Sequence, residues 1–255
     1  TLFVSFRSTG QLASFRINPA NGRLTALSVV AGGEDPAFLQ PDSTGRFLIS
    51  AYYISNKVTV HRLDRQGRIS NQPLQTILTA EKAHGVAIDS KDRFVFVPHT
   101  GGNRIHQFAF DTARGRLKAL DPPFLARPKG EHPRHIVMHP SDRWAYTSNE
   151  AGDSLGVFSV DPKTGRLKSL QTLSSLPREF NKEANATARC EMTPDGRFLV
   201  WRKKGFCCFK GFGTLLDLNE IQGIRTRGCN NSIFLLKMSA TDAELTPLLA
   251  GIAGK

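Results

Sequence analysis

The sequence predicts an all-β fold, namely a β-propeller built from four-stranded antiparallel blades. The first observation is a unit that recurs four times: an apolar run, a turn rich in Pro, Ser and Asp that carries an arginine, and a second apolar run. Each recurrence comes about 50 residues after the last, which is the length of chain that one four-stranded blade requires. The four copies lie at residues 40–48, 89–95, 139–145 and 193–199.

A second turn lies between the copies of the first and repeats with a similar period. It consists of glycine, arginine and an aliphatic residue. Its copies are Gly22-Arg23-Leu24, Gly67-Arg68-Ile69, Gly115-Arg116-Leu117 and Gly165-Arg166-Leu167. Two turns in each period predict two hairpins in each blade. The flanking runs, such as residues 57–63 and 154–160, place apolar side chains at every second position, as strands do.

Length and hydropathy predict a single domain over residues 1–255, because a chain of this size buries a sizeable core. No apolar stretch approaches the roughly 20 residues that a membrane-spanning helix requires. The sequence opens on Thr1-Leu2-Phe3-Val4 without a basic leader. We therefore expect no membrane partner and a cytoplasmic location, and a leader removed upstream of Thr1 is the alternative.

The charge balance raises the question of nucleic acid, since 34 basic and 22 acidic residues give a net charge of +12. Eight of the arginines belong to the two recurring turns, which distributes them over both rims of the predicted propeller. Nucleic-acid-binding proteins usually collect basic side chains on one face, often between aromatic ones. We therefore expect no nucleic-acid partner. The net positive charge is better interpreted as a basic funnel that attracts small anionic substrates.

The cysteines do not predict a metal site. All four lie in the last third of the chain, at Cys190, Cys207, Cys208 and Cys229. Adjacent Cys207 and Cys208 lack the gap of two to four residues with which two thiolates bind one zinc ion. We expect no metal, no cofactor and free buried thiols, which are typical of a reducing compartment.

Hairpin geometry predicts which polar residues meet at one rim. The strands before and after the first recurring turn form an antiparallel pair, so the start of the first strand lies beside the end of the second. In the unit around Arg143, the first strand starts near Arg134 and the second ends near Glu150. The first unit places Asp35, Tyr52 and Tyr53 at or near this rim. The other three units place polar residues there, among them His84, His99, Arg134, His135, Asn149, Glu150 and Arg189.

These residue types are suited to the hydrolysis of an ester-like bond. A carboxylate can take a proton from water, and a guanidinium group can stabilise the negative charge that develops on a carbonyl oxygen. The same polar groups could instead make hydrogen bonds that tie adjacent blades together. Position alone does not decide between these two roles.

Residues 82–86, 94–101, 133–140, 146–150 and 193–199 resemble the seven-bladed β-propeller lactonases. That family contains the propeller-type 6-phosphogluconolactonases and the fungal carboxymuconate-lactonizing enzymes. The resemblance covers residues 1–200 approximately and resumes near residue 227. Its most specific part is the Pro-Arg-His stretch with the following His-Pro and Asn-Glu pairs, whereas the Pro-Asp-Gly-Arg turn occurs in many propellers.

The resemblance implies metal-independent hydrolysis of a small anionic sugar lactone, 6-phosphogluconolactone, to 6-phosphogluconate in the pentose phosphate pathway. The matching catalytic residues are His84, Arg134, His135 and Glu150. In this hypothesis Glu150 orients or deprotonates the attacking water, Arg134 stabilises the oxyanion or the phosphate, and the histidines hold the lactone. Substrate contacts are expected from His99, Asn149 and Arg189. A carboxymuconate-lactonizing activity and a non-catalytic binding scaffold are the alternatives.

The sequence departs from the family pattern in two places. Arg189 stands where the family carries an acidic residue, which reverses a charge on the predicted rim. Residues 203–226 form an atypical inserted segment between the second and third strands of a blade, either a true loop or sequence that does not belong to the protein. Without it the chain, which starts at a second strand, supplies about five blades where the family has seven. An open ring exposes strand edges, so self-association through these edges is expected.

Overall fold

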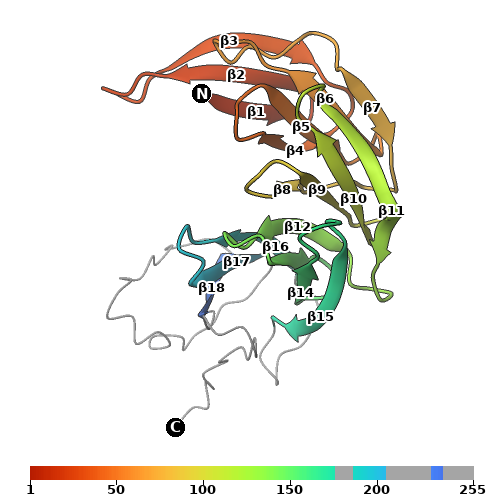
Figure 1. Cartoon of the computed structure of the whole chain (residues 1–255). Coiled ribbons are helices and arrows are strands. Elements are labelled where there is room, and N and C mark those ends of the chain that lie inside the picture. The colour runs from red at the N-terminus through yellow and green to blue at the C-terminus, as the bar shows by residue number, and fades with distance from the viewer. Residues whose placement is uncertain (176–185, 205–230, 238–255) are drawn as a thin grey trace.

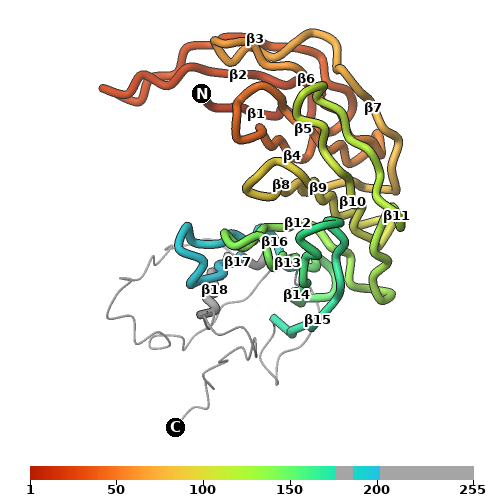
Figure 2. The backbone as a smooth tube through the Cα atoms, in the orientation of Figure 1, coloured from red at the N-terminus to blue at the C-terminus, as the bar shows by residue number. Residues whose placement is uncertain are grey.

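The described part of the chain forms an arc of β-sheets. A computed structural model describes residues 1–175, 186–204 and 231–237, and every regular element within these ranges is a β-strand. The strands form five antiparallel sheets that follow one another along the arc (Figure 1). Figure 2 shows the same path as a tube, with the first sheet at one end. The prediction of an all-β propeller with about five blades is confirmed.

The first, second and third sheets follow the chain order. The first sheet contains β1 (Leu2–Phe6), β2 (Gln11–Ile17) and β3 (Leu24–Ala31). The second contains β4 (Pro36–Pro41), β5 (Phe47–Tyr52), β6 (Lys57–Arg62) and β7 (Gln75–Leu78). The third contains β8 (Ala87–Ile88), β9 (Phe94–His99), β10 (Arg104–Asp111) and β11 (Arg116–Ala126).

The remaining sheets continue the pattern. The fourth contains β12 (Pro133–Met138), β13 (Trp144–Asn149), β14 (Ser154–Val160) and β15 (Leu167–Ser174). The fifth contains β16 (Ala186–Met192), β17 (Phe198–Lys204) and β18 (Asn231–Lys237). The turn at Gly22 joins β2 to β3 as the turn at Gly67 joins β6 to β7, so β1 corresponds to a second strand, as predicted.

The pairing of β17 with β18 places residues 231–237 as the third strand of the fifth sheet. The pairs run from Phe198 opposite Lys237 to Lys204 opposite Asn231. Residues 205–230 lie between these two strands in sequence and outside the described residues. Most of the predicted atypical segment 203–226 therefore lies outside them too, as do Cys207, Cys208 and Cys229.

Both recurring turns adopt left-handed backbone conformations. At the second turn, Gly22, Gly67, Gly115 and Gly165 have φ angles of 70, 83, 67 and 72°. Glycine has no Cβ and takes this conformation without strain, which explains why the turn repeats it. At the first turn, Asp92 and Asp142 occupy the same conformation with φ of 54 and 58°, and aspartate is among the few other residues that tolerate it.

The turns also connect neighbouring sheets. The Ser43 amide donates to the Asp92 carboxylate over 3.1 Å, and the Ser90 amide donates to Asp142 over 2.8 Å. Two arginines of these turns also reach the next sheet. The Arg46 guanidinium donates to the carbonyl oxygen of Thr112, and the Arg93 guanidinium donates to the carbonyl oxygen of Pro162, both over 3.0 Å. These arginines are therefore structural contacts between blades.

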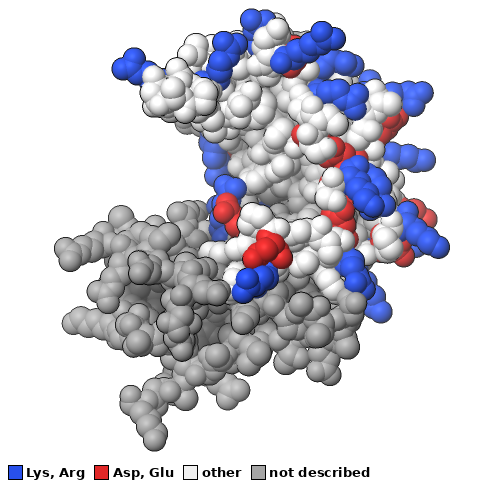
Figure 3. Space-filling view, turned by 60° about the vertical axis from the view of Figure 1, so that its left-hand side comes forward, with Lys and Arg blue, Asp and Glu red and all other residues white. Residues whose placement is uncertain are grey.

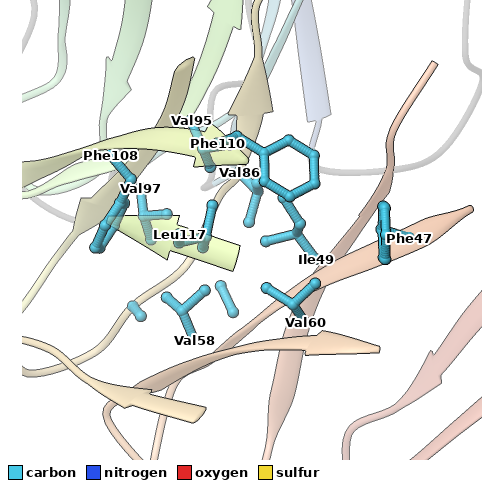
Figure 4. Close-up of a cluster of buried hydrophobic side chains, with 12 residues drawn as sticks. Phe47, Ile49, Val58, Val60, Val86, Val95, Val97, Phe108, Phe110 and Leu117 are labelled. Carbon is cyan, nitrogen blue, oxygen red and sulfur yellow. The ribbon is translucent and has the colours of Figure 1, made fainter. Parts of the chain in front are cut away.

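Apolar side chains fill the space between the faces of adjacent sheets. Figure 4 shows the cluster between the second and third sheets, where Phe47, Ile49 and Val60 pack against residues of β9 and β10. Gly115 closes this cluster, because a Cβ there would lie 2.2 Å from the Phe47 ring. Gly165 has the same relation to Phe94 in the next pair of sheets. A glycine at the equivalent position of the turn thus permits the same close contact at each of two successive interfaces.

Candidate functional site

The second strands of four sheets end at equivalent places on one rim. The residues that follow these ends, Tyr53, Thr100 and Glu150, each donate their backbone N–H to a residue just before the first strand of the same sheet, over 2.9 to 3.1 Å. The acceptors are Asp35, Lys82 and His132, and all three have φ between 54 and 58°. In the first sheet the equivalent residue is Arg7, which follows β1. The hairpin geometry predicted for this rim is confirmed.

Irregularities in the first strands redirect their side chains. The register shifts between Pro36 and Phe38, between Pro133 and His135, and between Thr187 and Cys190. A bulge changes the direction in which the extra residue points, and Arg134 is the extra residue of β12.

The four predicted catalytic residues lie close together. Arg134 Nε lies 3.2 Å from Glu150 Oε1, with 9% of the arginine and 27% of the glutamate side chain exposed. The rings of His84 and His135 meet edge to face, with centroids 4.8 Å apart, and both histidines are buried. These contacts join the start of β12, the end of β13 and the segment before β8. The structure thus combines an ion pair with a pair of imidazoles.

Gly85 permits the third and fourth sheets to approach at this point. A Cβ at Gly85 would lie 2.9 Å from the carbonyl oxygen of Arg134 and 3.0 Å from the Cα of His135. Any larger residue would push β12 away from the segment that carries His84. The glycine therefore permits the close approach of the two backbone segments that carry the imidazoles.

Aromatic and cationic side chains surround the imidazole pair. The Phe38 ring lies edge-on to His135 at 5.5 Å, and the Arg189 guanidinium lies 5.6 Å from the Phe38 ring. These three residues belong to the second, fourth and fifth sheets, so their contacts cross the concave side of the arc. Tyr53 lies edge-on to His84 at 5.8 Å. Phe38 was not predicted, because in sequence it is one apolar residue in an apolar run.

Arg7 is a second residue that the sequence did not indicate. Its guanidinium group forms a two-point contact with the Asp35 carboxylate, in which Nη2 donates to Oδ2 over 2.7 Å. The pKa of Arg7 is raised above its usual value, chiefly by this hydrogen bond and also by the negative charges of Asp35 and Glu150.

Comparison with known proteins identifies the family of this chain. Residues 1–250 match the model of the lactonases with a seven-bladed β-propeller. The chain belongs to this lactonase family. It is 34% identical over 198 residues to a 6-phosphogluconolactonase of Pectobacterium carotovorum and 30% identical to one of Xenorhabdus nematophila. Both matches cover 78% of this chain and 58% of the relative, so the chain spans less than two thirds of these relatives.

Solved structures also resemble this lactonase-family chain. A periplasmic gluconolactonase of Pseudomonas aeruginosa superimposes with a TM-score of 0.70 and 25% identity over 79% of this chain and 60% of the other. A protein of Lactobacillus plantarum gives a TM-score of 0.75 at 18% identity over 96% and 66% of the two chains. The second likeness shows the fold alone.

Asn149 and His99 lie inside the blades of the lactonase fold. Both are completely buried and occupy the last position of β13 and β9, one residue before the rim. The Asn149 amide donates to Ser154 Oγ over 3.0 Å and accepts from the Thr147 hydroxyl at the same distance. The Nδ1–H of His99 donates to the Val97 carbonyl oxygen, and its Nε2 accepts from the Thr79 hydroxyl. These hydrogen bonds thus join the two side chains to residues other than His84, Arg134, His135 and Glu150.

His99 forms a separate buried cluster with His106, and their ring centroids lie 4.6 Å apart. Burial, with the nearby charges of His106 and Arg104, lowers the pKa of His99 to about 3. Burial and Arg104 lower the pKa of His106 to about 4. Both imidazoles are therefore neutral in the folded chain at neutral pH.

Because of this buried histidine cluster, acid is expected to destabilise the folded protein. The unfolded chain binds protons at these imidazoles below about pH 6.5, whereas the folded chain does not bind them until about pH 3 to 4. The free energy of unfolding should thus decrease as the pH is lowered through this window. Protonation of His99 in the unfolded chain alone should lower it by on the order of 2 kcal/mol between pH 7 and pH 5. Urea unfolding at both pH values measures this, and His106→Asn should lessen the dependence. Equal stability at pH 7 and pH 5 would contradict it.

Two further observations concern metals and membranes. Among the described residues, no group of three or more His, Cys, Asp or Glu side chains is placed to hold a metal ion. The same residues include no helix of the length and apolarity that crossing a membrane requires.

Proposed function

We propose that the protein hydrolyses a sugar lactone, with 6-phosphogluconolactone as substrate and 6-phosphogluconate as product, a step of the pentose phosphate pathway. The observation that carries the proposal is the Arg134–Glu150 ion pair at 3.2 Å beside the buried His84–His135 pair. The relatives named 6-phosphogluconolactonase, at 30 to 34% identity, support the choice of substrate.

In the proposed reaction, the oxygen of a water molecule bonds to the lactone carbonyl carbon while Glu150 accepts a proton from that water. The π electrons of the carbonyl group move to its oxygen, and the Arg134 guanidinium stabilises the negative charge there. When the tetrahedral intermediate collapses, the bond between the carbonyl carbon and the ring oxygen breaks. The ring oxygen takes the proton from Glu150 and leaves as a hydroxyl group.

The remaining residues of the group position the substrate. His84 and His135 hold the lactone, because their buried rings lie against each other and His135 directly follows Arg134 in β12. Arg189 lies at the edge of the site with more than half of its side chain exposed and assists binding. Substrate contact by His99 and Asn149 stays a prediction, and the proposed mechanism does not use these two residues.

The test is a lactone-opening assay on the whole chain. The protein should open 6-phosphogluconolactone faster than the spontaneous rate in the same buffer, with saturation at high substrate. The reference is an equal concentration of an unrelated protein. A rate equal to the spontaneous one at every substrate concentration would refute the proposed function and leave the binding scaffold as the better hypothesis.

We also propose that the partner is a small molecule and that neither nucleic acid nor a membrane binds. The arginines of the first recurring turn support this, because Arg46 and Arg93 bind carbonyl groups of neighbouring sheets. In Figure 3 the basic side chains are scattered over the visible face, with acidic ones between them. Mobility shift with duplex DNA and co-sedimentation with anionic vesicles should both be negative, and binding in either assay at physiological salt would contradict the proposal.

Self-association through the exposed end of the arc is a further part of the proposal. One face of the first sheet packs Leu12 and Val30 against Leu48 of the second sheet. The cross-strand pairs place only apolar residues along the central part of the opposite face, and Leu24 and Val29 there are about half exposed. This face consists of Leu2, Val4, Phe6, Ala13, Phe15, Ile17, Leu24, Ala26 and Val29, with Gln11 and Ala31 at its edge.

We assign this face to a second copy of the chain, because every pair of adjacent sheets in the structure associates face to face through apolar residues. Sedimentation velocity should show a dimer that Val29→Lys shifts toward monomer. Leu78→Lys, on a β7 position that is 81% exposed and outside this face, is the matched control. A monomer at all concentrations would contradict the assignment.

For the compartment we propose the cytoplasm. A phosphorylated lactone carries charges that oppose passage through a bilayer, so its hydrolysis takes place where it forms. Cys190 is a free buried thiol, and burial raises its pKa to about 11. The gluconolactonase of Pseudomonas aeruginosa is by contrast periplasmic. Fractionation of the source cells tests this proposal, and recovery in a periplasmic extract would refute it.

A further inference from the structure

Tyr53 lies between two cations and a histidine of the catalytic group. The Arg7 guanidinium carbon lies 5.6 Å and the Lys82 ammonium nitrogen 5.7 Å from the centre of its ring, within the range of cation–π attraction. The same ring lies 5.8 Å from that of His84. A row of contacts thus runs from Lys82 through Tyr53 and His84 to His135.

Lys82 differs from three arginines of this rim in its charge balance. Three arginines are each paired with a carboxylate, in the pairs Arg7–Asp35, Arg134–Glu150 and Arg189–Glu191. Within the described ranges, no carboxylate lies within ion-pair distance of the Lys82 ammonium group. Of the two cations that contact Tyr53, Lys82 is thus the one whose charge no neighbouring carboxylate in the described part of the chain balances.

The backbone holds Lys82 in an uncommon conformation. Its φ is 58°, which lysine rarely adopts, and such strain persists where surrounding contacts impose it. The Lys82 amide donates to Asn56 Oδ1 over 2.8 Å, and its carbonyl oxygen accepts from the Thr100 amide over 3.1 Å. These two bonds fix the base of the side chain beside Tyr53.

We propose that Lys82, assisted by Arg7, binds the phosphate group of a phosphorylated sugar lactone, with Tyr53 as the surface that holds both cations. The inference rests on the proposed lactonase function and names the residues that would select the phosphorylated substrate. The contact of Arg7 with Asp35 uses Nε and Nη2, so Nη1 remains to donate to a phosphate oxygen. The sugar then extends along the row toward His84 and His135, where its lactone carbonyl meets Arg134 and Glu150.

The kinetic test compares two lactones. Lys82→Ala should lower kcat/KM for 6-phosphogluconolactone about tenfold or more, since it removes a charge-assisted hydrogen bond. The value for unphosphorylated gluconolactone should stay the same. Lys91→Ala, which removes an equal charge from a turn at the opposite rim, is the matched control and should change neither value. Equal losses for both lactones, or a selective loss in Arg189→Ala and not in Lys82→Ala, would overturn the assignment.

A binding test separates this inference from the proposed function. Calorimetric titration with 6-phosphogluconate and with gluconate requires no turnover. If the wild-type chain binds 6-phosphogluconate, and Lys82→Ala but not Lys91→Ala weakens this binding, the phosphate site stands even where no lactone is hydrolysed. If 6-phosphogluconate does not bind, or binds as tightly to Lys82→Ala as to the wild type, the phosphate site is refuted whatever the activity.

Discussion

Replacing Glu150 by Gln should lower kcat/KM for 6-phosphogluconolactone by about 100-fold or more, which is the usual contribution of a positioned general base. Glutamine keeps the size of the side chain but cannot accept the proton of the attacking water. Glu150→Asp, which keeps a carboxylate at a shorter reach, should retain part of the activity. Initial rates corrected for spontaneous opening measure both effects.

Glu150→Gln changes both the stability of the protein and its net charge, and each change needs a control. Glu150→Gln leaves the largely buried Arg134 without its carboxylate partner, which should lower the free energy of unfolding by about 1–3 kcal/mol. Rates must therefore be measured well below the unfolding temperature of the variant. Asp64→Asn removes the same charge from an exposed turn and should leave activity unchanged. Full activity of Glu150→Gln would exclude Glu150 as the base.

The second large effect is expected at Gly115. Alanine there should lower the free energy of unfolding by about 2–5 kcal/mol, because two costs combine. A left-handed conformation costs a residue with a Cβ about 1–2 kcal/mol, and the new methyl group would enter the ring of Phe47, which is 1% exposed in a packed core. Denaturant unfolding of the variant and the wild type measures the difference.

Gly22 provides a matched comparison for Gly115. It occupies the same turn in the first sheet with φ of 70°, and a Cβ there would meet no atom within 4 Å. Gly22→Ala should therefore show only the backbone cost, about 1–2 kcal/mol. Leucine is smaller than phenylalanine, so Gly115→Ala should lower the free energy of unfolding less in a Phe47→Leu background than in the wild type. Equal destabilisation by Gly22→Ala and Gly115→Ala would show that the contact with Phe47 contributes nothing.

The sequence predicted the sheets well because the turns repeat. Gly22, Gly67, Gly115 and Gly165 mark one turn of four successive sheets, and their conformations depend on local chemistry that the sequence carries. Strand alternation then fixes which residues face the core. The number of sheets and the rim shared by His84, Arg134, His135 and Glu150 followed from the same repeat.

The sequence did not separate the rim from the blade interior at single-residue precision. Asn149 and Glu150 are neighbours, yet the first is completely buried and the second reaches the ion pair, because successive strand residues point to opposite faces. The bulge at Arg134 shifts this alternation and leaves no mark in the sequence. Phe38 and Arg7 reach the site across the arc, through contacts between sheets that are distant in sequence.

The rim positions after the second strands have one further consequence. Tyr53, Thr100 and Glu150 make the same backbone hydrogen bond, and Arg7 follows the equivalent strand of the first sheet, yet the four side chains are a phenol, an alcohol, a carboxylate and a cation. An exchange of side chains at Tyr53, Thr100 and Glu150 changes the chemistry of the rim while the hydrogen bonds beneath them stay the same. New substrate preferences can therefore arise in this architecture by single substitutions, without insertion of loops or displacement of strands.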